Sequence, residues 1–142
     1  MLKQINTKRV VVGGVLGGIV WIAWGFVIYF GLLGPRYAEA QQAGQYLAEP
    51  RYGFFPIAWI ALELLLALMC AALYAAVREG WGPGPGTALR LGLMVGFAAG
   101  FPISFAMATW SPAPRIFPLG WMAELWVGAV VATLVAGWIY RE

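Results

Sequence analysis

The sequence predicts an all-α integral membrane protein, built as a bundle of four transmembrane helices. Hydrophobic residues make up 62% of the 142 residues and charged residues only 11%, whereas soluble domains carry about 25% charged residues. So few charges cannot cover a soluble domain, and much of the surface must therefore face lipid. The apolar residues also fall into four runs, each long enough to cross about 30 Å of hydrocarbon at about 1.5 Å per residue.

The four runs give the predicted spans, which are residues 10–33, 54–77, 88–110 and 117–140. They are continuous rather than alternating, which predicts helices and not the strands of a barrel. The first run is too long for the apolar core of a cleaved signal peptide, and no small-residue cleavage site follows it. We therefore expect residues 1–142 to form a single transmembrane domain.

The first connection is predicted to carry a short helix that lies on the membrane surface. It opens with Gly34-Pro35 and closes with Glu49-Pro50, and both dipeptides are expected to stop a helix. Residues 36–48 between them are rich in helix formers. Four of these residues share one face at helical spacing, namely Tyr37, Ala40, Gly44 and Leu47. Such a stretch is typical of an interfacial helix.

The other two connections are predicted to be tight turns. The second connection, residues 79–87, contains the run Gly-Trp-Gly-Pro-Gly-Pro-Gly at residues 80–86, which is typical of a tight turn without regular structure. Residues 111–115 form a connection that is shorter still. Connections of this length place consecutive helices side by side and antiparallel, as in a compact bundle.

The basic residues predict the orientation of the chain. One side of the membrane receives Lys3, Lys8, Arg9, Arg78, Arg90 and Arg141, and the other receives Arg36, Arg51 and Arg115. Loops on the cytoplasmic side carry the excess of lysine and arginine. We therefore expect both termini in the cytoplasm.

An internal repeat predicts that the bundle consists of two tandem helical hairpins. Residues 55–59 read Phe-Pro-Ile-Ala-Trp and residues 117–121 read Phe-Pro-Leu-Gly-Trp, and a glutamate follows each tryptophan within four residues. The second and fourth spans are followed by Arg78-Glu79 and Arg141-Glu142. The first and third spans both carry small residues four apart. Chance similarity between short strings is the alternative interpretation.

Glycines predict close packing between helices. Candidate packing positions are Gly13, Gly17, Gly92, Gly96 and Gly100. Helices in lipid associate through such small residues, because these let the backbones approach. The packing could lie inside the bundle or against a partner, and a ligand-accommodating groove is the less favoured alternative.

Glu63 and Glu124 are the strongest candidates for a functional site. A charged side chain at mid-bilayer costs about 2.5–3.5 kcal/mol on insertion scales, so an intramembrane carboxyl group needs a partner or a function. Their depths, together with that of Ser104, suggest one polar cluster. Three interpretations remain open. The carboxyl groups could be neutral and hydrogen-bond across helices, for instance to Trp59 or Trp121. They could meet a partner subunit or pigment, or they could bind a proton or cation on a transport path.

Composition argues against several other classes of function. The chain has no histidine and a single cysteine, Cys70. We therefore expect no metal site, no cofactor and no catalytic residues, since the usual ligands and imidazole bases are missing. The net charge of +3 is small and scattered, which argues against nucleic acid as a partner.

The layout resembles a group of uncharacterised bacterial four-helix membrane proteins of about this length. The resemblance is carried by residues 9–14 (Arg-Val-Val-Val-Gly-Gly), 74–78 (Tyr-Ala-Ala-Val-Arg), 82–87 (Gly-Pro-Gly-Pro-Gly-Thr) and 137–142 (Gly-Trp-Ile-Tyr-Arg-Glu). It covers nearly the whole chain and implies the four-span fold and, as the expected location, a bacterial inner membrane. It implies no activity and no site residues.

The function expected from these observations is non-catalytic. The first expectation is an accessory or structural subunit that packs with other membrane subunits or with itself. The alternative is a small oligomeric transporter or channel-like protein that uses the intramembrane glutamates to bind a proton or cation.

Overall fold

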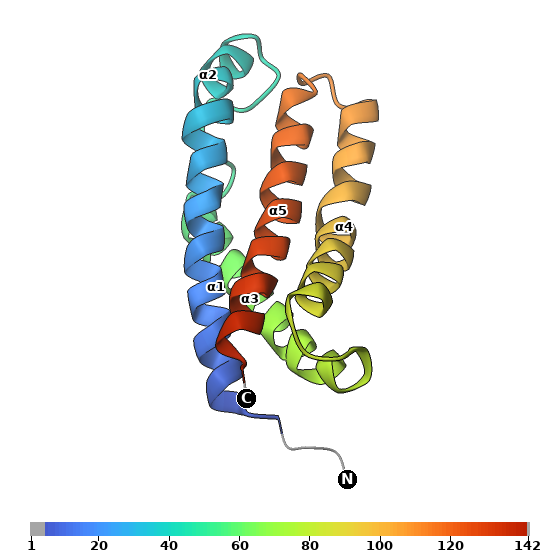
Figure 1. The fold of residues 1–142 in the computed structure, drawn as a ribbon. Helices are drawn as coiled ribbons and strands as arrows, with labels where there is room; N and C mark the ends of the chain where they lie inside the picture. Colours follow the sequence, from blue (N-terminus) through green and yellow to red (C-terminus); the bar gives the residue numbers. More distant parts are fainter. Residues whose placement is uncertain (1–4, 142) are drawn as a thin grey trace.

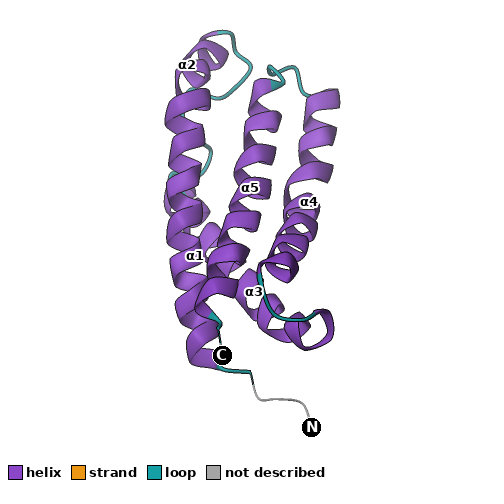
Figure 2. Ribbon diagram, viewed as in Figure 1, coloured by secondary structure: helices purple, strands orange, loops and turns teal. Residues whose placement is uncertain are grey.

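The computed structural model describes residues 5–141. Within this range the chain consists of helices joined by loops and contains no strand (Figure 2). The helical segments are α1 (Thr7–Ile28), η1 (Tyr29–Leu33), α2 (Gly34–Gln42), α3 (Phe55–Trp81), α4 (Pro85–Trp110) and α5 (Ile116–Ile139).

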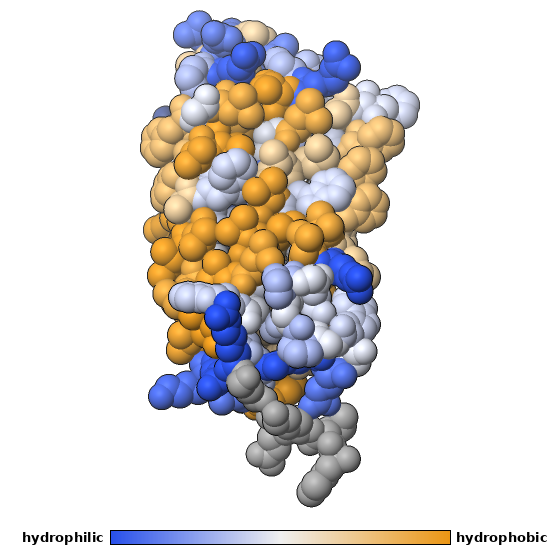
Figure 3. All heavy atoms as spheres, viewed as in Figure 1, coloured by the Kyte–Doolittle hydropathy of each residue, from blue (hydrophilic) through white to orange (hydrophobic). Residues whose placement is uncertain are grey.

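The prediction of four transmembrane helices is confirmed. Four continuous helices in the described range are long and apolar enough to span a membrane: Thr7–Gln42, Phe55–Trp81, Pro85–Trp110 and Ile116–Ile139. Figure 3 shows hydrophobic residues gathered in a broad belt around one face of the molecule and hydrophilic residues gathered mostly at its two ends. The chain is therefore an integral membrane protein.

Helix α5 is the centre of the bundle, because it packs closely against α1, α3 and α4, whereas the backbones of α1 and α4 do not come close to each other within the described residues. Both ends of the described chain lie at one end of the bundle together with the α3–α4 turn (Figure 1). We call this the terminal end. The opposite end carries α2 and the turn at residues 111–115, and we call it the α2 end.

The first helix runs without a break for 36 residues, from Thr7 to Gln42, so the prediction that Gly34-Pro35 ends it is wrong. The backbone changes to π-helical geometry over Tyr29–Leu33, where the Gly34 N–H donates to the Tyr29 carbonyl. Pro35 has no N–H to donate, and in an α-helix the ring of a proline clashes with the carbonyl four residues earlier. The wider π turn relieves that clash, so the helix continues through Pro35.

Helix α2 occupies part of the predicted surface helix but ends at Gln42 rather than at residue 48. Gly44 has a φ of 71°, the left-handed conformation in which glycine commonly terminates a helix. The Gln45 N–H donates to the Ala40 carbonyl at 2.9 Å and closes the last turn. Helix α2 therefore continues the first transmembrane helix and is not a separate surface helix.

The α3–α4 turn is shorter than predicted. Helix α3 continues to Trp81 and α4 begins at Pro85, where the missing N–H of proline costs nothing. Only residues 82–84 connect the two helices. Gly82 and Gly84 have φ values of 84° and 122°, which favour glycine.

Glycines bring α1 and α5 into backbone contact. A Cβ on Gly13 would lie 3.1 Å from the Ala136 Cα, and a Cβ on Gly17 would lie 2.8 Å from the Ala132 carbonyl oxygen. These neighbours are backbone atoms and cannot move aside as a flexible side chain can. The helices therefore approach this closely because the positions carry no side chain.

Helix α4 packs on α5 through a second row of glycines. A Cβ on Gly92 would lie 2.6 Å from the Val130 Cα, and a Cβ on Gly100 would lie 3.2 Å from the Met122 carbonyl oxygen. Gly96 lies between them on the same face. The candidate packing glycines thus make contacts inside the chain.

Tyr140 ties the terminal end together. Its hydroxyl accepts a hydrogen bond from the Asn6 N–H at 2.8 Å, and its carbonyl accepts one from Arg78 at 2.9 Å. The guanidinium group of Arg78 also lies 4.9 Å from the centre of the Tyr140 ring. The N-terminal turn of α1, the end of α3 and the end of α5 meet at this residue.

The variant Tyr140→Phe is expected to lower the free energy of unfolding by about 1 kcal/mol, since the Asn6 N–H loses its acceptor. Reversible unfolding in mixed detergent micelles measures this change, and amide hydrogen exchange should increase in the first turn of α1. Tyr52→Phe is the matched control, because Tyr52 is exposed. If Tyr140→Phe and Tyr52→Phe lowered the free energy of unfolding equally, the stabilising role of the hydrogen bond between the Asn6 N–H and Tyr140 would be contradicted.

Candidate functional site

Glu63 and Glu124 occupy equivalent positions in their helices. Each is the ninth residue of a helix that runs from the α2 side toward the terminal end, α3 from Phe55 and α5 from Ile116. Both side chains are buried, with exposed fractions of 2% for Glu63 and 7% for Glu124. At about 1.5 Å per residue, each lies about 12 Å from the start of its helix.

The two carboxyl groups meet at Gly25 of α1. A Cβ on Gly25 would lie 3.0 Å from Oε1 of Glu63 and 3.0 Å from Oε1 of Glu124, so the two oxygens are at most about 6 Å apart. Any side chain at position 25 would press against both groups. Three helices therefore form the site. Helices α3 and α5 each contribute a carboxyl group, and Gly25 of α1 leaves room for both groups.

Trp59 holds the carboxyl group of Glu124. It precedes Glu63 by four residues on α3, so both side chains lie on one face of that helix. Its indole N–H donates to Oε1 of Glu124 at 2.8 Å. Hydrogen bonds between transmembrane helices contribute about 0.6 kcal/mol on average and up to about 1.7 kcal/mol, so this bond helps to fix α3 against α5.

Trp59 also lies near Glu63, but one oxygen of that carboxyl group is left without a donor. Its Oε1 is buried and receives no hydrogen bond from an N–H or hydroxyl group of the described residues. The carboxyl group lies beside that of Glu124, since both groups approach Gly25. Two ionised carboxylates are both acceptors and cannot bond to each other, and like charges this close repel in surroundings of low polarity. The geometry therefore favours a pair that carries one proton.

Ser104 lies apart from this pair. It is buried on α4, one turn beyond Gly100 on the row of small residues that packs against α5. No hydrogen bond within residues 5–141 joins it to either glutamate. Of the three residues in the predicted polar cluster, the structure brings together Glu63 and Glu124.

Gly25 and Trp24 are site residues that the sequence did not single out for this role. The indole N–H of Trp24 donates to the Ala123 carbonyl at 3.1 Å and joins α1 to α5 beside Glu124. A signal for Gly25 is present in the sequence, since it continues the four-residue series of Gly13 and Gly17, with Trp21 between. That series predicts one face of α1 but does not identify its neighbours.

Residues 5–141 contain no group of three histidine, cysteine, aspartate or glutamate side chains placed to hold a metal ion. No family model, curated protein or solved structure matches the chain. A function of this chain must therefore be inferred from the geometry of the carboxyl pair.

Proposed function

We propose that this chain is a non-catalytic membrane protein that binds a proton at the Glu63–Glu124 pair and acts as a small transporter or channel-like protein. The main support is the meeting of two buried carboxyl groups from different helices, with one Glu63 oxygen that has no N–H or hydroxyl donor. Intramembrane carboxyl groups are costly to bury, and they often mark proton or ion pathways.

A proton suits this pair better than a metal cation. The Trp59 N–H is directed at Oε1 of Glu124, and a cation bound to that oxygen would face the positive end of the N–H dipole. Calcium takes six to eight oxygen ligands, and magnesium requires a near-ideal octahedron. Two carboxyl groups supply few of these ligands, whereas one proton satisfies both groups at once.

We further propose that the protein lies in a bacterial inner membrane with both termini in the cytoplasm, and the distribution of charge supports this orientation. The described basic residues of the terminal end are Lys8, Arg9, Arg78, Arg90 and Arg141, and those of the α2 end are Arg36, Arg51 and Arg115. The excess of positive charge is expected on the cytoplasmic side. Lys3, which would add to it, lies outside the described residues.

The pairs α1–α3 and α4–α5 are further proposed to be tandem hairpins of common origin. Glycine lines both contacts, since Gly18 of α1 faces Leu64 of α3, and Gly96 of α4 faces Trp126 of α5. The second helix of each pair carries its glutamate at the ninth position. Glu142, from the second Arg-Glu pair, lies outside the described residues.

Labelling with a carbodiimide tests the proposal, because this reagent attacks protonated carboxyl groups in apolar surroundings. The purified protein is expected to be labelled at Glu63 or Glu124, and the double variant Glu63→Gln/Glu124→Gln should lose that label. In proteoliposomes with an imposed pH gradient, each single variant is expected to abolish the proton flux measured with an entrapped pH dye.

Glu49→Gln is the matched control, because Glu49 lies in the exposed loop between α2 and α3. It should leave both the label and the flux unchanged. The unfolding midpoint of each variant separates loss of function from loss of fold. Wild-type flux in both single variants would overturn the proposal.

An accessory subunit is the second candidate, and the outer face of α4 favours it. The rings of Phe97, Phe101 and Phe105 stack along this helix with centroid separations of 5.1 Å and 5.7 Å. A partner would have to use such a face, because the glycine rows are occupied within the chain. Purification from native membranes in mild detergent tests this role, and a lone homogeneous particle at every detergent strength would contradict it.

A further inference from the structure

The carboxyl pair has different surroundings toward the two ends of the bundle. On the side of the terminal end it meets an apolar layer one turn away, formed by Trp21, Ala67 and Ala129, each with 0% of its surface exposed. The indole N–H of Trp21 has no hydrogen-bond partner among the described residues, but an indole N–H is a donor only and cannot pass a proton on. This layer therefore contains no group that could relay a proton. The next polar side chains, Cys70 and Thr133, lie a further turn away, where the Thr133 hydroxyl donates its hydrogen to the Ala129 carbonyl at 2.6 Å.

On the side of the α2 end the pair is followed by hydroxyl groups. Trp121, one turn from Glu124 on α5, donates its N–H to the Tyr37 hydroxyl at 3.1 Å. Trp121 and Glu124 are three residues apart on one face of α5, so the Tyr37 hydroxyl lies about one helical turn from the Glu124 carboxyl group, and no hydrogen bond joins the two among the described residues. Because the Tyr37 hydroxyl oxygen accepts the hydrogen bond from the Trp121 indole, the hydroxyl hydrogen remains free to be donated.

Tyr46 continues this series toward the surface. Its ring centroid lies 5.8 Å from that of Tyr37 and 5.0 Å from that of Phe117. Its hydroxyl is buried and has no hydrogen-bond partner among the described residues. Burial raises the pKa of the Tyr46 phenol above its ordinary value of 10.0, so the hydroxyl keeps its proton at neutral pH.

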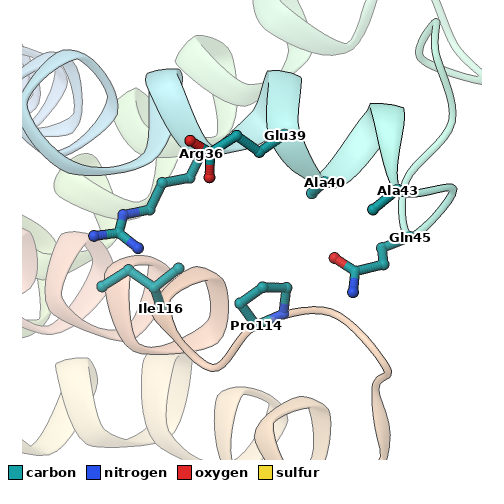
Figure 4. Close-up of a pocket in the computed structure, with 7 residues that line it drawn as sticks. All are labelled: Arg36, Glu39, Ala40, Ala43, Gln45, Pro114 and Ile116. Atoms are coloured by element: carbon teal, nitrogen blue, oxygen red, sulfur yellow. The ribbon is translucent and has the colours of Figure 1, made fainter.

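A hollow of about 180 Å³ opens at the α2 end, between α2 and the turn at residues 111–115 (Figure 4). Ala40 lines it and also belongs to the buried cluster against which Tyr37 and Tyr46 pack. Arg36, Glu39 and Gln45 supply a polar rim. A polar hollow of this size has room for several water molecules.

We infer that protons enter and leave the Glu63–Glu124 pair from the α2 end, through the hollow and the hydroxyl groups of Tyr46 and Tyr37. The inference rests on the proposed proton-binding function and adds its sidedness. A hydroxyl oxygen accepts a proton from water or from the preceding hydroxyl and releases its own hydrogen to the next acceptor. Charge and proton number on each tyrosine are therefore restored after every transfer.

Exchange of the carboxyl proton for deuterium tests this route. The reconstituted protein is moved from H₂O to D₂O, and the shift of the protonated carboxyl C=O stretch is followed by infrared spectroscopy. Glu63→Gln and Glu124→Gln assign the band. Tyr46→Phe and Tyr37→Phe are each expected to slow the exchange about tenfold, which corresponds to about 1.4 kcal/mol in the barrier.

Tyr46→Phe is the cleaner variant, because its hydroxyl makes no bond in the described structure and its loss should not weaken the fold. Tyr52→Phe, at an exposed phenol, and Tyr74→Phe, at the terminal end, are the controls and should exchange at the wild-type rate. Wild-type exchange in both Tyr37→Phe and Tyr46→Phe would overturn the route while the carboxyl band still supports the proton site. Slower exchange in Tyr74→Phe would indicate entry from the terminal end. Absence of the band from the wild-type protein would overturn both proposals.

Discussion

Replacing Gly128 with alanine is expected to lower the free energy of unfolding by about 2–3 kcal/mol, the upper range for overpacking a well-filled core. Gly128 lies on α5 directly against the indole ring of Trp21 on α1, and a Cβ at this position would overlap that ring. The ring cannot move aside, because Trp21 is fully buried among Ala67, Ala129 and their neighbours. The strain must therefore push α1 away from α5.

Unfolding in mixed detergent micelles measures this loss, and Gly80→Ala is the matched control. Gly80 also lies in a helix, but nothing lies within 4 Å of a Cβ there. Its replacement should stabilise the protein by up to about 1 kcal/mol through helix propensity. The double variant Gly128→Ala/Trp21→Phe should be less destabilised than the sum of its parts, because the smaller ring makes room. A stability of Gly128→Ala within about 0.5 kcal/mol of wild type would contradict this packing.

The sequence predicted the spans well, because hydrocarbon thickness and helical rise leave little freedom. It also predicted that Glu63 and Glu124 lie at similar depths, since each follows the start of its helix by a similar number of residues. Depth is a property of one helix at a time. For that reason it could be read from spacing without knowledge of the neighbouring helices.

Rotation of a helix about its own axis could not be predicted in the same way. Ser104 has a suitable depth but packs on α5 with the glycine row of α4, and no hydrogen bond in the described chain joins it to the carboxyl pair. The position of Gly25 between the two glutamates could not be predicted either. It depends on how α1, α3 and α5 are rotated against one another. Periodicity defines a face but does not identify what covers it.

Local backbone geometry was the other source of error. Proline usually interrupts a helix, and Gly34-Pro35 was expected to do so. The π turn over Tyr29–Leu33 absorbs the proline instead, and Leu33 then packs closely against Gly120 of α5. This tertiary contact favours a continuous helix and outweighs the local preference. The continuous helix also positions Tyr37 on the side of the carboxyl pair that faces the α2 end.

Glu124→Leu is expected to destabilise the protein by about 2 kcal/mol, whereas Glu63→Leu should change stability by less than about 0.5 kcal/mol. The difference follows from the hydrogen bonds. Loss of the Glu124 carboxyl group leaves the Trp59 N–H in the interior without an acceptor, a cost of about 1–3 kcal/mol, and it removes a link between α3 and α5. Oε1 of Glu63 receives no N–H or hydroxyl hydrogen bond from the described residues, and the indole N–H of Trp59 donates to Glu124 instead.

A double-mutant cycle isolates the bond between Trp59 and Glu124. Trp59→Phe keeps most of the ring but removes the donor, and we expect a coupling energy of about 1–2 kcal/mol, at the upper end for interhelical hydrogen bonds in membranes. Glu124→Gln should retain most of the stability, because an amide oxygen still accepts the indole N–H. If Glu124→Gln keeps the fold but loses proton flux, the carboxyl group is retained for its proton and not for its hydrogen bond. If instead Glu63→Leu is as destabilising as Glu124→Leu, the pair holds the helices together through both members, and the case for a proton site is weakened.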